Sequence, residues 1–78
     1  MKDKDLLETF ARNLRYLRSE RGMTLRELAE ALKIGRSTLS EYENAETDPS
    51  LTVIKKIADY FGKSVDWLVG DTKERRGW

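Results

Sequence analysis

The stretch MTLRELAEALKIGRSTLSEYEN, residues 23–44, decides the fold of this chain. Thr24 and Glu27 have the Thr-x-x-Glu spacing of a capping box, in which two residues cap each other's backbone N–H groups at the start of a helix. Apolar side chains then recur at helical spacing, and the pattern breaks at 33–35. A second short helix is predicted over 36–44. Two short helices joined by about three residues form a helix-turn-helix.

The flanking sequence predicts three further helices. Leucine and phenylalanine side chains at three- and four-residue spacing predict a helix over 4–20, which a glycine ends. Ser50 is placed to cap a helix over 51–61, and Ser64 is placed to cap a short helix over 65–69. No segment alternates with period two for long enough to form a strand.

Length and helix content together predict one small all-α domain. The chain has 78 residues, and tight links join its five expected helices. We place the domain at 1–70 and a polar tail at 71–78. No apolar run approaches the ~18 residues of a membrane span, and the N-terminus lacks the apolar region of a signal peptide. We therefore expect a cytoplasmic protein.

The composition excludes most catalytic and metal-binding chemistry. The chain has no cysteine and no histidine, which removes the usual zinc sites and the Ser/His and Cys/His nucleophile pairs. The acidic run Glu41, Glu43, Glu46 and Asp48 lacks the spacing and the glycine of a calcium loop. We predict no catalytic residue, no metal ligand and no cofactor.

Charge alone does not predict a nucleic-acid binder, because the net charge is only +1. The distribution says more, since basic residues concentrate in the first 36 residues. A helix that reads DNA has to protrude into a major groove about 12 Å wide, while its partner helix braces it at a close crossing. Ala29 is a small residue where such a crossing would need one.

These residues resemble the helix-turn-helix of the lambda-repressor/Cro-like family, also called the XRE family. The pieces that carry the resemblance are Glu-Leu-Ala at 27–29, Ser-Thr-Leu-Ser at 37–40 and Tyr-Glu-Asn at 42–44, and the likeness covers about residues 6–70. The resemblance implies the five-helix lambda-repressor-like fold and double-stranded DNA binding without a cofactor. It also implies a homodimer on a near-palindromic operator and a transcriptional regulator, most often a repressor.

The resemblance also assigns roles to single positions. Base-reading positions fall on Arg36, Ser37, Ser40 and Glu41, and DNA-backbone positions fall on Thr24, Leu25 and Asn44. A charge pair that braces the first helix against the third falls on Arg18 and Glu43. The chemistry agrees, since arginine can bond guanine O6 and N7, glutamate can accept from cytosine N4, and serine is nearly unselective.

Three positions depart from the family pattern. Leu25 stands where the family often has a glutamine that bonds a phosphate, which leaves only the backbone amides of that helix start. Lys33 stands where glycine is common, and a left-handed lysine there would cost about 1–2 kcal/mol. Gly35 replaces a capping Ser or Thr and caps almost as well.

Two interpretations of function stay open at this point. The first is a sequence-specific repressor, which the Arg36 pattern and the basic first helix favour. The second is an antitoxin or adaptor that uses the same fold to bind a protein, which the acidic run and the missing glutamine favour. The outward face of 36–44 is alternatively only a solvated helix face. Arg12, Arg15, Arg18 and Arg21 form either an ordinary polar face or a phosphate clamp.

The expected dimer surface is the short helix over 65–69. Its apolar residues cannot all point inward, so some apolar area should be exposed there; they are Val65, Trp67, Leu68 and Val69. Trp78 would extend this patch if the tail folds back. Alternatively, the chain is monomeric in solution and pairs only on DNA, since one or two side chains give a small interface.

Overall fold

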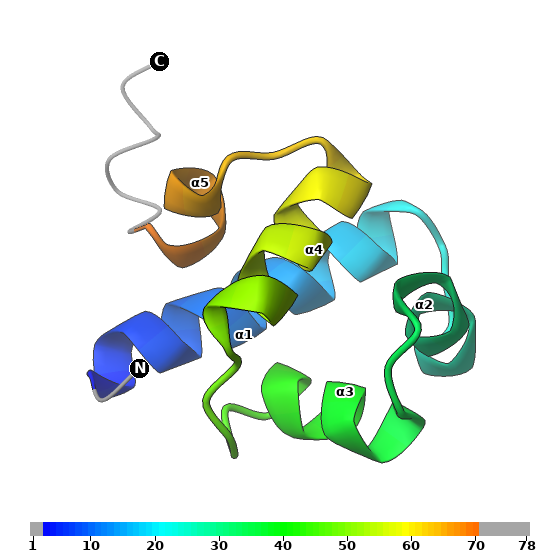
Figure 1. The fold of residues 1–78 in the computed structure, drawn as a ribbon, viewed down its shortest axis with the longest axis horizontal. Helices are drawn as coiled ribbons and strands as arrows, with labels where there is room; N and C mark the ends of the chain where they lie inside the picture. Colours follow the sequence, from blue (N-terminus) through cyan, green and yellow to red (C-terminus); the bar gives the residue numbers. More distant parts are fainter. Residues whose placement is uncertain (1–2, 71–78) are drawn as a thin grey trace.

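The computed structural model describes residues 3–70, and this part of the chain contains helices and no strand (Figure 1). The helices are α1 (Lys4–Glu20), α2 (Leu25–Leu32), α3 (Arg36–Glu43), α4 (Leu51–Phe61) and α5 (Val65–Val69). The prediction of an all-α, five-helix domain is therefore confirmed. α3 ends one residue earlier than predicted, with Asn44 as its C-cap. None of these helices is long and apolar enough to cross a bilayer.

Side-chain caps set the helix starts. The Thr24 hydroxyl accepts from the Glu27 N–H at 3.0 Å, and the Glu27 carboxylate accepts from the Thr24 N–H at 2.8 Å, which confirms the capping box. The hydroxyls of Ser50 and Ser64 cap α4 and α5, as predicted, by accepting from the N–H groups of Val53 at 3.1 Å and Trp67 at 3.0 Å. Gly35 begins α3 without any side-chain bond. Each of these three side-chain caps stabilises the fold by on the order of 1 kcal/mol.

One apolar core holds all five helices together. α1 packs against α3 and α5, while α2 packs against α3 and α4. The largest fully buried side chains come from every helix: Phe10, Leu14, Leu28, Leu32, Leu39, Ile57 and Leu68. Ala29 is buried, as a close crossing between α2 and its neighbours requires. Each large apolar side chain removed from water contributes about 1.5–3 kcal/mol.

Four of the helices end in the same way. A left-handed residue follows α1, α2, α3 and α4, with φ between 57° and 68°, at Gly22, Lys33, Ala45 and Gly62. The next residue donates its N–H to the carbonyl five positions back, at 2.9–3.2 Å. This is the Schellman pattern, which satisfies carbonyls that the helix leaves unpaired. Glycine adopts this backbone freely, whereas Lys33 and Ala45, which flank α3, adopt it at a cost of roughly 1–2 kcal/mol.

Candidate nucleic-acid interface

The helix α3 has an inward face and an outward face. Leu39, Tyr42 and Glu43 are buried, and the Tyr42 ring meets the Phe10 ring of α1 edge-on with centroids 6.3 Å apart. The outward face carries the four residues predicted to read bases, Arg36, Ser37, Ser40 and Glu41, of which Ser40 is half-buried and the others are exposed. The structure thus brings the four together, because residues one turn apart share a face.

The outward side chains have few bonds of their own. Within residues 3–70, Arg36, Ser37 and Glu41 form no side-chain hydrogen bond or ion pair. Their donors and acceptors are therefore available to a ligand. They combine a cation, a hydroxyl and a carboxylate on one exposed helix face, which suits the mixed donor and acceptor edges of base pairs.

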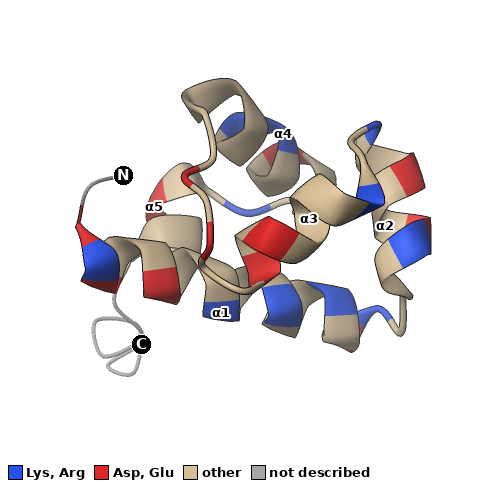
Figure 2. Cartoon of the chain, turned by 90° about the horizontal axis from the view of Figure 1, so that it is seen from below, with Lys and Arg blue, Asp and Glu red and all other residues tan. Residues whose placement is uncertain are grey.

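An ion pair holds the inward face of α3 against α1. Arg18 donates from Nε to Glu43 Oε2 at 2.6 Å and from Nη2 to Oε1 at 3.0 Å, a two-bond geometry that makes such pairs strong. The Arg18 Nη1 donates to the Met23 carbonyl at 3.0 Å, and Arg15 donates to the Glu43 carbonyl. Figure 2 shows basic segments of α1 beside the acidic part of α3. This contact holds α3 in place against α1, so that the opposite face of α3 points to solvent.

The Glu43 side chain is only 6% exposed and the Arg18 side chain is 25% exposed. The hydrogen bond that Arg18 donates to Glu43 raises the pKa of the Arg18 guanidinium, partial burial lowers it, and the attraction between the charges raises it. Arg18 is therefore a permanent cation beside a buried carboxylate. The sequence alone left the burial of this pair open.

The predicted DNA-backbone residues lie at two separate places. Thr24 is the exposed N-cap of α2, and Leu25 is half-buried against the core. Within the described range, the first-turn N–H groups of Leu25 and Arg26 have no bonding partner, as is usual at a helix start. Asn44 is exposed at the far end of α3, and its side-chain amide bonds Ser40.

Three of the four arginines considered for a phosphate clamp, two on α1 and one at its C-cap, are engaged within the protein. Arg15 and Arg18 bind Glu43, and the Arg21 guanidinium lies over the rings of Tyr60 and Phe61, 5.3 and 4.9 Å from their centroids. These contacts favour the structural interpretation of α1 over the phosphate clamp. In the described part of the chain, no three carboxylates converge as a metal site would require.

The short helix α5 does not expose all four residues predicted for a dimer. Leu68 is fully buried, so its side chain belongs to the core and not to a surface. The reason is Asn13, whose buried amide donates to the carbonyls of Trp67 at 3.2 Å and Leu68 at 2.8 Å and fixes how α5 is rotated. Val65, Trp67 and Val69 are half-buried. Trp78 lies outside the described residues.

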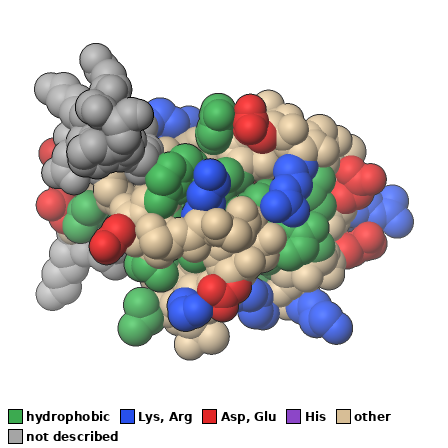
Figure 3. Space-filling view, turned by 90° about the horizontal axis from the view of Figure 1, so that it is seen from above, with side chains coloured by type: hydrophobic (Ala, Val, Ile, Leu, Met, Phe, Trp, Pro, Cys, Tyr) green, Lys and Arg blue, Asp and Glu red, His purple; other side chains and the backbone are tan. Residues whose placement is uncertain are grey.

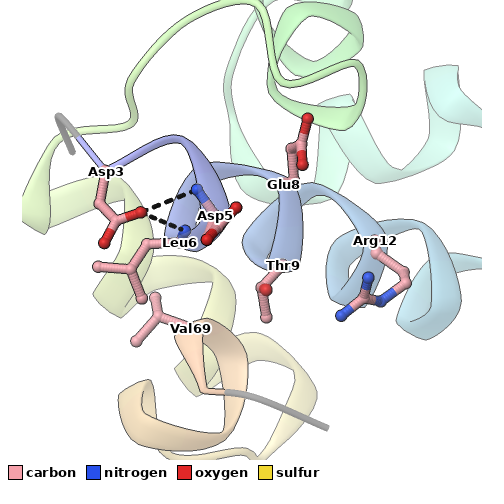
Figure 4. Close-up of a pocket in the computed structure, with 7 residues that line it drawn as sticks. All are labelled: Asp3, Asp5, Leu6, Glu8, Thr9, Arg12 and Val69. Carbon is pink, nitrogen blue, oxygen red and sulfur yellow. Dashed lines mark hydrogen bonds between the residues drawn. The ribbon is translucent and has the colours of Figure 1, made fainter.

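The surface around α5 is mixed in character. Figure 3 shows hydrophobic side chains interrupted by basic and acidic ones on the side that is uppermost in Figure 1. Val69 and Leu6 line a surface pocket of about 330 Å³ between the end of α5 and the start of α1 (Figure 4). Leu6 is 41% exposed. Its side chain lies beside that of Val69, with Thr9 to one side (Figure 4). The apolar area here is small and divided.

Comparison with known proteins identifies the family. The model of the helix-turn-helix family matches residues 14–68, more than half of the chain, and the chain belongs to that family. The type is the XRE type, as the sequence resemblance indicated.

Curated relatives carry the names of regulators. The chain is 31% identical over 82% of its length to the cryptic phage CTXphi transcriptional repressor RstR of Vibrio cholerae. It is 34% identical over 80% to the transcriptional regulator ImmR of Bacillus subtilis, and 40% identical over 72% to DdrOP3 of Deinococcus deserti. The chain spans about half the length of these relatives, 58%, 49% and 43% respectively.

Solved structures agree with the fold. The hypothetical transcription factor NHTF from Neisseria superposes with a TM-score of 0.85 at 29% identity, over 96% of this chain and 87% of that one. The clp gene regulator ClgR from Corynebacterium glutamicum gives 0.73 at 35% identity, over 81% and 67%.

Proposed function

We propose that this chain is the sequence-specific, double-stranded-DNA-binding domain of a transcriptional repressor, with α3 in the major groove. The observation that carries the proposal is the two-sided α3. Its inward face is fixed by the Arg18–Glu43 pair, and its outward face presents unbonded polar side chains. The names of the curated relatives support the same function. It needs neither catalysis nor a cofactor, and it is exercised in the cytoplasm, where the DNA is.

Base reading falls to the outward face of α3. Arg36 at the start of the helix can bond guanine O6 and N7, and Glu41 can accept from cytosine N4. The unpaired N–H groups at the start of α2 can hold a backbone phosphate, since a helix N-terminus favours anions. Because the Leu25 side chain has no polar group, the contact between α2 and the phosphate relies on the protein's backbone amides. Thr24 at the start of α2 and Asn44 at the end of α3 contact the DNA backbone at two separate places.

A single α3 contacts too few base pairs for useful specificity, so two copies should bind together. A two-fold dimer places its recognition helices about 34 Å apart on one side of the duplex, which makes the operator near-palindromic. The surface we assign to this contact is α5, through Val65, Trp67 and Val69, together with Leu6 across the pocket. Because the apolar area of this surface is small, we expect two copies of the chain to pair weakly in solution and more strongly when both bind the same DNA.

Selection from a library of randomised duplexes tests the proposal. The wild-type chain should enrich a near-palindromic sequence, and Arg36→Ala should weaken binding by about 1–3 kcal/mol and relax preference at one position in each half-site. Lys55→Ala is the matched control, because it removes one positive charge on α4, outside the helix-turn-helix and the α5 surface, where Lys55 pairs with Asp59. The same sequence logo for the wild type and the Arg36 variant would refute the assignment. No enriched duplex at low salt would favour the protein-binding alternative.

A further inference from the structure

A hydrogen bond on the reading face of α3 has a defined direction. The Asn44 Nδ2 donates to the Ser40 carbonyl at 2.9 Å. A carbonyl oxygen only accepts, so the amide nitrogen, and not the amide oxygen, has to face Ser40. The same nitrogen lies 3.4 Å from the Ser40 hydroxyl oxygen and donates to it as well. The orientation of Asn44 is therefore fixed by chemistry.

This contact changes what the Ser40 hydroxyl can offer. A hydroxyl has one donor and two acceptor sites, so a free serine can pair with either kind of base edge. In Ser40, Asn44 occupies one of the two acceptor sites, while the hydroxyl proton has no acceptor within residues 3–70 and is free to donate. Ser37, one turn earlier on the same face, has no such neighbour and keeps both options.

We propose that Asn44 favours Ser40 as a hydrogen-bond donor in base reading, because it fills one acceptor site of the hydroxyl, and so gives selectivity to a residue type that is nearly unselective. A donor pairs with guanine O6, thymine O4 and purine N7, and it conflicts with the amino groups of cytosine and adenine. Asn44 is thus a positioning residue that acts through Ser40. The inference rests on the proposed DNA-binding function.

Four proteins in the same selection on randomised duplexes test this role: the wild type, Ser40→Ala, Asn44→Ala and the double variant. The position where Ser40→Ala changes the logo identifies the base pair that Ser40 reads. There the wild type should disfavour the base whose amino group faces Ser40. Asn44→Ala should reduce that discrimination about three- to tenfold, the range for one hydrogen bond. In the Ser40→Ala background, Asn44→Ala should change nothing further at this position.

Two controls separate positioning from other effects. Asn44→Ser, which is too short to reach both Ser40 oxygens, should match Asn44→Ala, and thermal melting of each variant should show the fold intact, since Asn44 is exposed. Preference at the position that Ser37→Ala identifies should stay as in the wild type.

The possible failures are distinct. A uniform loss of affinity with the logo unchanged would make Asn44 a phosphate contact only and would overturn the inference. A Ser40→Ala variant with the wild-type logo would also overturn it. Failure of the wild type to enrich any sequence would instead overturn the proposed function itself.

Discussion

Replacing either partner of the Arg18–Glu43 pair should destabilise the domain, and by unequal amounts. In Arg18→Met, the Glu43 carboxylate keeps its burial, with the side chain 6% exposed, and loses both hydrogen bonds. In Glu43→Gln, Arg18 is left with a side chain that is 25% exposed, reaches water, and keeps its bond to the Met23 carbonyl. The Arg18 variant should therefore be the less stable of the two.

The size of each effect follows from burial. Removing one partner of a fully buried ion pair costs about 3–5 kcal/mol, and the partial exposure of Arg18 reduces this to about 3 kcal/mol for Arg18→Met. For Glu43→Gln we expect about 1–2 kcal/mol, because a cation near water is poorly bonded rather than trapped. In a domain of this size, 3 kcal/mol corresponds to a fall in Tm of roughly 12–24 °C. An exposed pair would contribute only about 0.2–1 kcal/mol.

Thermal and urea unfolding measure the difference. Asp59→Asn is the matched control, because it breaks the Lys55–Asp59 pair on α4, in which both side chains are 63% exposed, and it should change stability by less than about 0.5 kcal/mol. The double variant Arg18→Met/Glu43→Gln should be little worse than Arg18→Met alone, since it no longer buries an unpaired charge. Equal losses for the two single variants, or additive losses in the double variant, would refute this account of the brace.

Three further outcomes are expected. Lys33→Gly and Ala45→Gly should each raise the free energy of unfolding by about 1 kcal/mol, because glycine removes the left-handed strain; a fall in Tm would contradict this. Asn13→Ala should cost about 1–3 kcal/mol by leaving two α5 carbonyls without that donor, and hydrogen exchange should quicken first in α5. Val69→Glu should abolish cooperative binding to a full operator in gel shifts but spare half-site binding; unchanged cooperativity would move the dimer surface elsewhere.

The helix boundaries could be predicted because local residues set them. Thr24, Ser50 and Ser64 cap helices through bonds to N–H groups three residues away, so sequence spacing alone contains the information. The left-handed Lys33 agrees with the family resemblance, because glycine is common at that position in the family. The outward face of α3 followed from helical periodicity, since Leu39 and Tyr42 had to face inward.

Contacts between distant segments could not be predicted. The partners of Asn13 lie 54 and 55 residues further along the chain, and nothing in the spacing around Asn13 indicates them. Those bonds turn Leu68 into the core, which is why four apolar residues could not be divided into core and surface from the sequence. Ala45 is a similar case, since alanine gives no local sign of a left-handed backbone.

The division of α3 into a holding side and a reading side also affects how new specificity arises. The side chains of Arg36, Ser37 and Glu41 make no bond that the described fold depends on, whereas those of Glu43 and Tyr42 on the other side make such contacts. Substitutions on the reading side should therefore leave stability within about 0.5 kcal/mol, as at other exposed sites. After duplication of such a gene, a few substitutions on this face would let one copy of the protein recognise a different operator, and the protein would stay folded after each substitution. The same independence makes α3 a practical place to engineer a repressor with a chosen target.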